Sequence, residues 1–185
     1  MTIKIVVKTC RFGLGVFASE HINRGAEILR FEGPFVSADH PLNQGCSESY
    51  LIQIGPREYF YPKAPGRYVN HSCNPNAGLS NRFFLIALRD IAPSEQIFFD
   101  YSTTIDNDPW SMPCGCGEPS CRGIVGEFRH LPEHVQKTYL EKRVVAPFIA
   151  EHATCGQGSL FSEPVLALAS SLVDTAESIL PVLQV

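Results

Sequence analysis

The chain has 185 residues, of which 44% are hydrophobic and 18% charged, so it suits one domain with a core and is too short for two ordinary domains. This composition excludes a wholly disordered chain. A formal net charge of −4, with only 15 Lys and Arg, argues against direct binding to nucleic acid. The acidic balance would suit a basic partner such as a lysine-rich peptide, but excess carboxylate is also a common aid to solubility.

The N-terminal segment and the cysteine count bear on the compartment. Residues 1–13 contain too short an apolar run for the core of a signal peptide and no small-residue cleavage site. The chain has seven cysteines, and four of them lie in contexts typical of metal ligands rather than of a disulfide framework. We therefore expect an intracellular protein, cytoplasmic or nuclear, that does not enter a membrane.

Short strands are predicted along the first hundred residues. Runs of β-branched and aromatic residues alternate with turns of Gly, Asn, Pro and Ser, which is typical of antiparallel strands. Many short strands with little helix predict a mostly β fold of the α+β kind, built from small antiparallel sheets. The predicted strands are residues 3–7, 14–18, 26–31, 50–54, 58–62, 83–88 and 96–101.

Two helices are predicted after the strands. Residues 131–146 place Pro132 in a first helical turn, space apolar residues near the helical period and stop at Pro147. After a glycine-containing linker at 152–159, residues 165–179 repeat apolar residues every three or four positions. Acidic residues keep this second run below the length of a membrane span. It is therefore either a helix packed on its own domain or a surface for a homodimer or another partner.

Three stretches of the strand region carry chemical groups. Gly13 and Gly15 flank one residue between two strands, which leaves backbone groups free to meet a carboxylate or phosphate, although a plain tight hairpin has the same pattern. Residues 67–79 are dense in polar side chains, and such a stretch is either a solvated loop or an organised binding site. Residues 94–102 form an apolar strand with Tyr101 near its end, where a tyrosine is commonly a core residue.

A loop rich in glycine and proline follows, with the closely spaced cysteines Cys114, Cys116 and Cys121. Three thiolates at this spacing suit tetrahedral Zn²⁺, which needs a fourth ligand from elsewhere. A disulfide is the competing interpretation. It is disfavoured because Cys114 and Cys116 are too close together to pair comfortably and because an intracellular setting is reducing.

Taken together and in this order, the four stretches resemble the SET-domain lysine methyltransferases that carry a post-SET zinc loop. The resemblance covers residues 3–125 and depends on GLGVFA, RYVNHSCNPN, SEQIFFDY and the C-x-C-x-x-x-x-C loop. It implies the SET-domain β-fold with its pseudoknot, and a transferase that moves methyl groups from S-adenosylmethionine to protein lysines and releases S-adenosylhomocysteine. It also implies a SET domain at 1–109, a post-SET zinc loop at 110–126 and a C-terminal helical extension at 127–185.

The resemblance assigns roles to individual residues. Tyr101 is implied to be catalytic, with its hydroxyl orienting the lysine nitrogen and the methyl group. The backbone of the glycine turn and an Asn-His pair are implied to hold the cofactor, four cysteines to hold a structural zinc, and aromatic residues to line the lysine channel. These sets are Phe12, Gly13, Leu14, Gly15, Asn70 and His71 for the cofactor; Cys73, Cys114, Cys116 and Cys121 for zinc; and Phe31, Tyr50, Tyr68 and Phe99 for the channel.

Two positions bear on the product. In the family, a phenylalanine two residues before the catalytic tyrosine tends to permit di- or trimethylation; Phe99 matches it, although core packing explains this phenylalanine equally well. Phe31 stands where many members carry a tyrosine, which removes a hydroxyl near the substrate. The expected substrate is a lysine of a histone or of another protein or peptide. The alternative is a SET-derived, zinc-stabilised module that holds a peptide without turnover.

Overall fold

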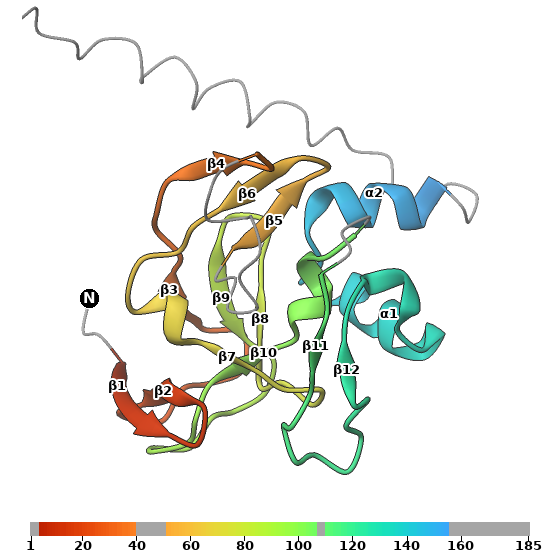
Figure 1. Ribbon diagram of the computed structural model, residues 1–185. Helices are drawn as coiled ribbons and strands as arrows, with labels where there is room; N and C mark the ends of the chain where they lie inside the picture. The colour runs from red at the N-terminus through yellow and green to blue at the C-terminus, as the bar shows by residue number, and fades with distance from the viewer. Residues whose placement is uncertain (1–3, 40–50, 107–109, 156–185) are drawn as a thin grey trace, which may run out of the picture. The chain divides into compact units, whose positions relative to one another are not determined.

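The structure is a computed structural model that describes residues 4–39, 51–106 and 110–155 (Figure 1). The chain divides into two compact units, residues 1–153 and 154–185. The second helix and the homodimer surface predicted around 165–179 lie outside the described residues, as does Tyr50. No described helix has the length and hydropathy needed to cross a bilayer.

Small antiparallel sheets make up most of the first unit, which confirms the predicted mostly β fold. A hairpin pairs β1 (Ile5–Cys10) with β2 (Gly13–Ala18). The remaining antiparallel sheets have the orders β3 (Glu27–Arg30), β9 (Phe84–Ala87), β8 (Ala77–Leu79); β4 (Phe35–Ser37), β6 (Glu58–Phe60), β5 (Ile52–Gly55); and β11 (Met112–Pro113), β12 (Ile124–Val125).

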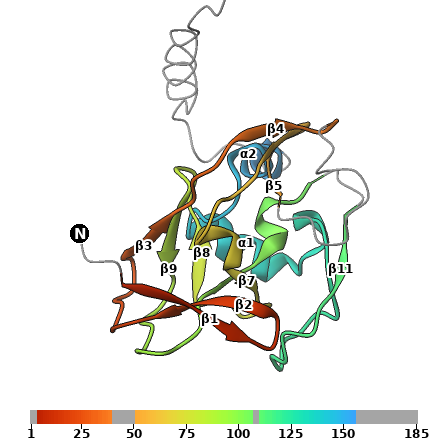
Figure 2. The same ribbon diagram turned by 60° about the vertical axis from the view of Figure 1, so that its left-hand side comes forward.

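One pairing is parallel and joins two segments that are distant in sequence. β7 (Asn70–His71) lies beside β10 (Phe98–Phe99), with Asn70 opposite Phe98 and His71 opposite Phe99. Figure 1 shows β7 and β10 next to each other, and Figure 2 shows β7 close to the β1–β2 hairpin. The pairing brings the polar stretch that begins at Asn70 alongside the strand that leads into η3, a 3₁₀ helix at Tyr101–Thr104.

The hydrophobic core lies between the small sheets. Burial alternates along β9, as expected where one face of a strand packs inward, and Leu85 on that strand has no exposed surface. Val16 and Ile97 are likewise fully buried, and Phe31 and Phe99 close the core on the side of η3. The core therefore holds β2, β9 and β10 in place around the site described below.

The helical segment differs from its prediction. α1 (Glu133–Glu141) ends five residues early, and Pro147 begins a further helix, α2 (Pro147–Cys155), rather than ending the first. Arg143 has a φ of 55°, which a continuing right-handed helix does not allow. Proline suits a first helical position because it lacks the N–H that would have no partner there.

A second hydrophobic cluster forms where these helices meet the strands. It contains Phe128, Leu131, Tyr139, Val144, Val145 and Ile149, and Figure 1 shows α1 and α2 on the same side of the strands. A Cβ placed on Gly78 of β8 would lie 2.6 Å from Val144, so the contact requires glycine. The residues before α2 therefore pack directly on the β3–β9–β8 sheet.

Candidate active site

The glycine turn between β1 and β2 is a tight reversal beside β7. Gly13 has a φ of 89°, a conformation that favours glycine. A Cβ on Gly15 would lie 2.5 Å from the side-chain nitrogen of Gln96, so the Gln96 side chain would have to shift to admit one. The Asn70 side-chain nitrogen donates to the Leu14 carbonyl at 2.9 Å. The structure thus joins the turn at 12–15 to the first residue of the Asn-His pair.

His71 extends this contact toward Tyr101. The Tyr101 backbone N–H donates to His71 Nδ1 at 3.2 Å, and His71 Nε2 lies 3.4 Å from Cys73 Sγ. Burial lowers the pKa of His71 to about 4, more than the nearby Asp100 carboxylate raises it. The imidazole is therefore neutral near pH 7, accepts at Nδ1 and has its proton on Nε2, facing sulfur.

Tyr101 stands between this histidine and an aromatic cavity. Its ring is tilted against the rings of His71 and Phe99, with centroids 5.3 and 4.9 Å away. Its hydroxyl donates to the Val69 carbonyl at 3.0 Å. The ring thus packs against two aromatic rings, and Tyr101 is among the residues that line the cavity.

The aromatic cavity has a volume of about 80 Å³ and is mainly apolar, with walls that include Phe31, Ile52, Tyr59, Val69, Phe99 and Tyr101. Phe31 and Phe99 meet edge to face, with centroids 6.0 Å apart. Tyr68 is not among the lining residues and packs against the hydrophobic core instead. Sequence reasoning missed Tyr59 and Gln53 of this wall, because strand alternation alone does not reveal which buried side chain borders a cavity.

Gln53 ties one wall of the aromatic cavity to the segment after η3. Its side-chain nitrogen donates to the Asp106 carbonyl at 2.9 Å, and its side-chain oxygen accepts the Asp106 N–H at 2.9 Å. The side chain is 3% exposed, so both bonds are shielded from water. They hold β5 against residue 106 on the far side of η3.

The four predicted metal ligands come together in space. The Sγ atoms of Cys73, Cys114, Cys116 and Cys121 all lie within 4.8 Å of one another. Cys73 comes from the segment after β7, whereas the other three come from the loop between β11 and β12. The cluster therefore fastens that loop to the segment that carries Asn70 and His71.

The four cysteine thiols lie so close together that they need a nearby positive charge before all of them can ionise. Burial raises the pKa of the Cys73 and Cys114 thiols. Burial alone would also raise the pKa of Cys116, but hydrogen bonds from the backbone N–H groups of Cys73 and Glu118 and from neighbouring thiols lower it to about 7. Several thiolates this close repel one another, so a bound divalent cation is what would let all four ionise.

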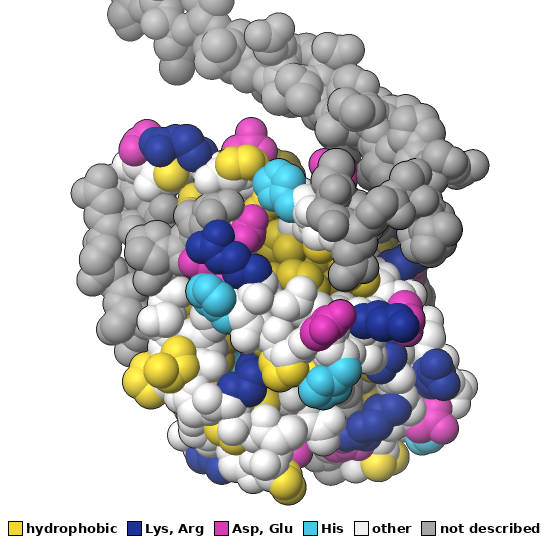
Figure 3. All heavy atoms as spheres, turned by 90° about the vertical axis from the view of Figure 1, so that its right-hand side faces the viewer, with side chains coloured by type: hydrophobic (Ala, Val, Ile, Leu, Met, Phe, Trp, Pro, Cys, Tyr) yellow, Lys and Arg dark blue, Asp and Glu magenta, His cyan; other side chains and the backbone are white. Residues whose placement is uncertain are grey.

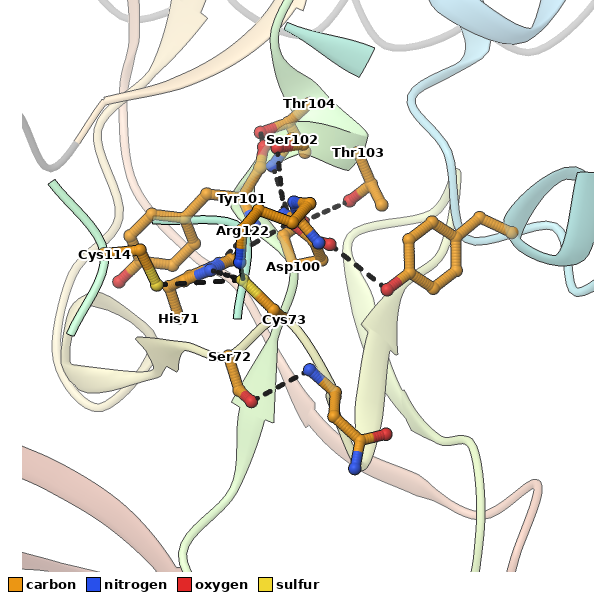
Figure 4. Close-up of polar contacts among 12 residues, drawn as sticks. His71, Ser72, Cys73, Asp100, Tyr101, Ser102, Thr103, Thr104, Cys114 and Arg122 are labelled. Carbon is orange, nitrogen blue, oxygen red and sulfur yellow. Dashed lines mark hydrogen bonds and ion pairs between the residues drawn. The ribbon is translucent and has the colours of Figure 1, made fainter. Parts of the chain in front are cut away.

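Asp100 is the centre of a buried polar group that we call the carboxylate network: Asp100, His71, Ser102, Arg122 and Tyr139. Its Oδ1 accepts from Arg122 at 2.8 Å and from the Ser102 N–H at 3.1 Å, and it lies 3.5 Å from His71 Nδ1. Figure 4 shows His71, Ser102 and Arg122 around Asp100. Burial alone would lower the pKa of Arg122, but the hydrogen bond to the Asp100 carboxylate and its negative charge raise this pKa overall.

Sequence reasoning assigned no role to Asp100, Arg122 or Tyr139. Asp100 and Arg122 directly adjoin Tyr101 and Cys121, for which roles were predicted, so adjacency was the available signal. Tyr139 gave no signal beyond its place on the apolar face of a helix.

Two further contacts hold the cysteine loop, one to the glycine turn and one to the segment after β7. The Arg11 guanidinium donates to the Cys116 carbonyl and lies over the Phe12 ring, with its carbon 4.5 Å from the centroid. The Asn74 side chain donates to the Glu118 carboxylate at 3.2 Å.

Figure 3 shows charges of both signs interspersed on the face it views, without a patch of one sign.

The SET domain family matches residues 13–102, from the glycine turn to the start of η3. Among curated proteins, a histone-lysine N-methyltransferase of Cryptococcus neoformans, named as H3 lysine-4 specific, is 30% identical over 129 residues, which are 60% of this chain and 9% of that protein. One of Mycosarcoma maydis, named as H3 lysine-36 specific, is 30% identical over 139 residues, 65% of this chain and 14% of that protein. The chain thus matches only a small part of each relative's length.

Solved structures share the fold. The methyltransferase domain of human histone-lysine N-methyltransferase SETMAR has a TM-score of 0.57 and 23% identity, covering 69% of this chain and 59% of that one. KRYPTONITE, in complex with mCHH DNA, an H3(1-15) peptide and SAH, has a TM-score of 0.53 and 21% identity, covering 68% and 30%. These likenesses confirm the predicted SET-domain fold.

Proposed function

Because residues 13–102 form a SET domain, we propose that the protein is an S-adenosylmethionine-dependent protein-lysine N-methyltransferase. The observation that carries the proposal is the unbroken series of contacts from Leu14 through Asn70 and His71 to Tyr101. A cavity of about 80 Å³ with mainly apolar walls adjoins Tyr101. One side of this series suits a methyl donor and the other suits a lysine side chain.

The cofactor side uses the backbone at Phe12, Gly13, Leu14 and Gly15, with Asn70 and His71. S-adenosylmethionine, when bound, supplies a methyl group on a positively charged sulfonium. No Cβ occupies the outer face of the turn at Gly13, and nothing lies within 4 Å of where one would be, so a ligand can approach the backbone there. Asn70 holds the turn through Leu14, and a neutral His71 adds no charge that would repel a cationic donor.

The substrate side is the aromatic cavity. A lysine ammonium has an unperturbed pKa of about 10.4 and must lose its proton before it has a lone pair. The apolar walls formed by Phe31 and Phe99 favour the neutral amine, so the proton can leave to water without a strong base. The Tyr101 hydroxyl then orients the nitrogen for in-line attack, and alignment supplies much of the acceleration.

The cysteine cluster is proposed to hold a structural zinc. Four thiolates complete a tetrahedron and leave no position open for water, so the ion would not take part in the transfer. Its effect is to keep the loop between β11 and β12 against Cys73, two residues from His71. The metal would thereby order one wall of the cofactor site.

The proposed substrate is a lysine in histone H3 or in another protein or peptide. Histone H3 is favoured because the curated relatives are named as H3 lysine-4 and H3 lysine-36 specific. Phe99, which has no hydroxyl to hold a water molecule in the aromatic cavity, favours di- or trimethylation. Phe31 acts in the same direction, because it too gives the wall an apolar ring.

Methyl transfer from isotopically labelled S-adenosylmethionine tests the proposal. The purified protein is incubated with histone H3 and a panel of lysine-containing peptides, and labelled lysines are identified by mass spectrometry. We expect label on lysine, with a rate that falls about 100-fold or more in Tyr101→Phe because one aligned hydroxyl is lost. Tyr61→Phe is the matched control, since Tyr61 does not line the aromatic cavity, and it should keep the full rate.

Two results would contradict the proposal. Binding of S-adenosylmethionine without transfer to any member of a broad panel would favour a peptide-holding module. Equal rates for the wild type and Tyr101→Phe would remove Tyr101 from the chemistry even if transfer occurs.

A further inference from the structure

Tyr139 of α1 reaches the active site from outside the part of the chain that matches the SET domain. Its hydroxyl donates to Asp100 Oδ2 at 3.1 Å, and the residue is 5% exposed. Burial and the Asp100 carboxylate raise the pKa of Tyr139, so the hydroxyl keeps its proton and remains a donor. A residue of the helical segment therefore bonds to the residue immediately before Tyr101.

The two oxygens of Asp100 have different partners. Oδ1 accepts from the Ser102 N–H and from Arg122, whereas the Tyr139 hydroxyl is the partner of Oδ2 among the residues that the structure describes. The Arg122 guanidinium also reaches the Ser102 hydroxyl, at 3.4 Å. Tyr139 is thus the group that fixes the second oxygen, whereas Arg122 bonds to the first.

The bond from Ser102 to Asp100 sets the direction of Tyr101. Asp100 is the N-cap residue of η3, and its side chain accepts the Ser102 N–H, which fixes the turn that begins at Tyr101. Without a donor on Oδ2, the carboxylate is free to rotate so that both oxygens meet the planar guanidinium, which is the preferred geometry of such a pair. That rotation would take Oδ1 from the Ser102 N–H and loosen the cap.

We infer that Tyr139 is a positioning residue for Tyr101, acting through the Asp100 carboxylate. This inference rests on the proposed function, since it assigns Tyr139 a part in aligning the catalytic hydroxyl. The same segment also holds η3 through its backbone, because the Ala146 N–H donates to the Thr103 carbonyl and the Phe128 N–H donates to the Ile105 carbonyl, both at 2.9 Å. The helical segment is therefore a support for the catalytic turn.

Tyr139→Phe tests the inference, because it removes the hydroxyl and keeps the ring that packs in the second hydrophobic cluster. Ile149→Val is the matched control: it removes one methyl group from the second hydrophobic cluster, and Ile149 carries no polar group that could bond to Asp100. Both variants are assayed for methyl transfer and for hydrogen exchange of the backbone amides, followed by mass spectrometry of peptides that cover residues 101–104.

We expect kcat to fall about tenfold in Tyr139→Phe, as for the loss of one aligning hydrogen bond, while the KM for S-adenosylmethionine stays within about twofold. Exchange at 101–104 should accelerate more than exchange at β9. Ile149→Val should keep the wild-type kcat and should not accelerate exchange selectively at 101–104. A role in general stability would instead change all peptides together.

Equal kcat and equal exchange at 101–104 in the two variants would overturn the inference. Failure of the proposed function is distinguishable, because the wild type would then transfer no methyl group to any substrate. The exchange comparison still decides in that case whether Tyr139 holds the turn at Tyr101.

Discussion

Asp100 and Tyr101 are neighbours in the chain, yet their side chains enter two regions of opposite character. Tyr101 borders the aromatic cavity, whose walls are mainly apolar. Asp100 lies at the centre of the carboxylate network, where its side chain has no exposed surface and bonds to Arg122, Ser102 and Tyr139. One region has space for a ligand, whereas the other is closed and filled by its own side chains.

The aromatic cavity and the carboxylate network therefore suit different tasks: the first can admit a ligand, and the second can fix the orientation of neighbouring groups. An apolar wall can admit and desolvate a lysine side chain, but apolar contacts alone do not fix the direction of a hydroxyl. A buried carboxylate with every partner in place fixes direction well, but it has no room for a substrate. Changes in the carboxylate network should therefore affect stability strongly, and changes in the aromatic cavity should affect the reaction more than stability.

The largest effect is expected from the cysteine cluster, which joins Cys73 to the loop between β11 and β12. Cys73→Ser should reduce bound zinc from about one ion per chain to near zero, because a structural site needs all four thiolates. Elemental analysis of the purified protein measures this. Cys10→Ser is the control, since Cys10 lies outside the cluster and should leave the zinc content unchanged.

The carboxylate network should respond strongly to loss of its central charge. Asp100→Asn leaves Arg122, whose side chain is 17% exposed, without its carboxylate, and should lower the free energy of unfolding by about 3 kcal/mol. Urea denaturation measures the change. Asp39→Asn makes the same chemical change in a pair with Arg57 whose side chains are 83% and 72% exposed, and it should cost less than about 1 kcal/mol. Equal losses in the two variants would contradict a special role for the network.

The packing of the helical segment behind the network gives a smaller effect. Gly78→Ala places a Cβ 2.6 Å from Val144 and should lower the free energy of unfolding by about 2 kcal/mol. In the double variant with Val144→Ala, the two γ-methyl contacts are removed although the contact with the Val144 Cβ remains, so the double variant should cost less than the sum of the two single variants. If the free-energy costs of the two single variants added fully, Val144 would not be in close contact with Gly78 of β8.

The smallest effect on stability is expected in the aromatic cavity. Phe99→Tyr keeps the aromatic ring and should change the free energy of unfolding by less than about 1.5 kcal/mol. The added hydroxyl can hold a water molecule in the aromatic cavity, so the products should shift from di- or trimethyllysine toward monomethyllysine. Mass spectrometry of the product peptides measures the shift, and an unchanged product distribution would separate Phe99 from the control of methylation degree.

Much of the fold could be predicted from short-range patterns, because β-branched runs between turn residues mark strands such as β2 and β9. β7 and β11 have two residues each, which is too short to produce a period, and they were not predicted. The parallel pairing of β7 with β10 depends on contacts between segments almost thirty residues apart, which no local pattern contains. The start of α2 was missed because proline was interpreted as a stop.

The candidate site likewise contains residues that could be predicted from the sequence and residues that could not. Residues of recognisable motifs, such as Gly13, His71 and Tyr101, could be assigned roles from the sequence because each lies in a dense stretch of special residue types. Tyr139 could not, since a tyrosine on the apolar face of a helix is ordinary. Its hydrogen bond to Asp100 appears only in the folded structure, where α1 brings the hydroxyl to the carboxylate.

The central claim is that Tyr101 serves methyl transfer rather than folding. Its most direct test measures the transfer rate and the free energy of unfolding in the same preparation of Tyr101→Phe. We predict that the rate falls about 100-fold, while stability falls by about 1 kcal/mol, the value of one hydrogen bond to Val69. An unchanged rate, or a loss of stability large enough to account for the lost rate, would contradict the claim.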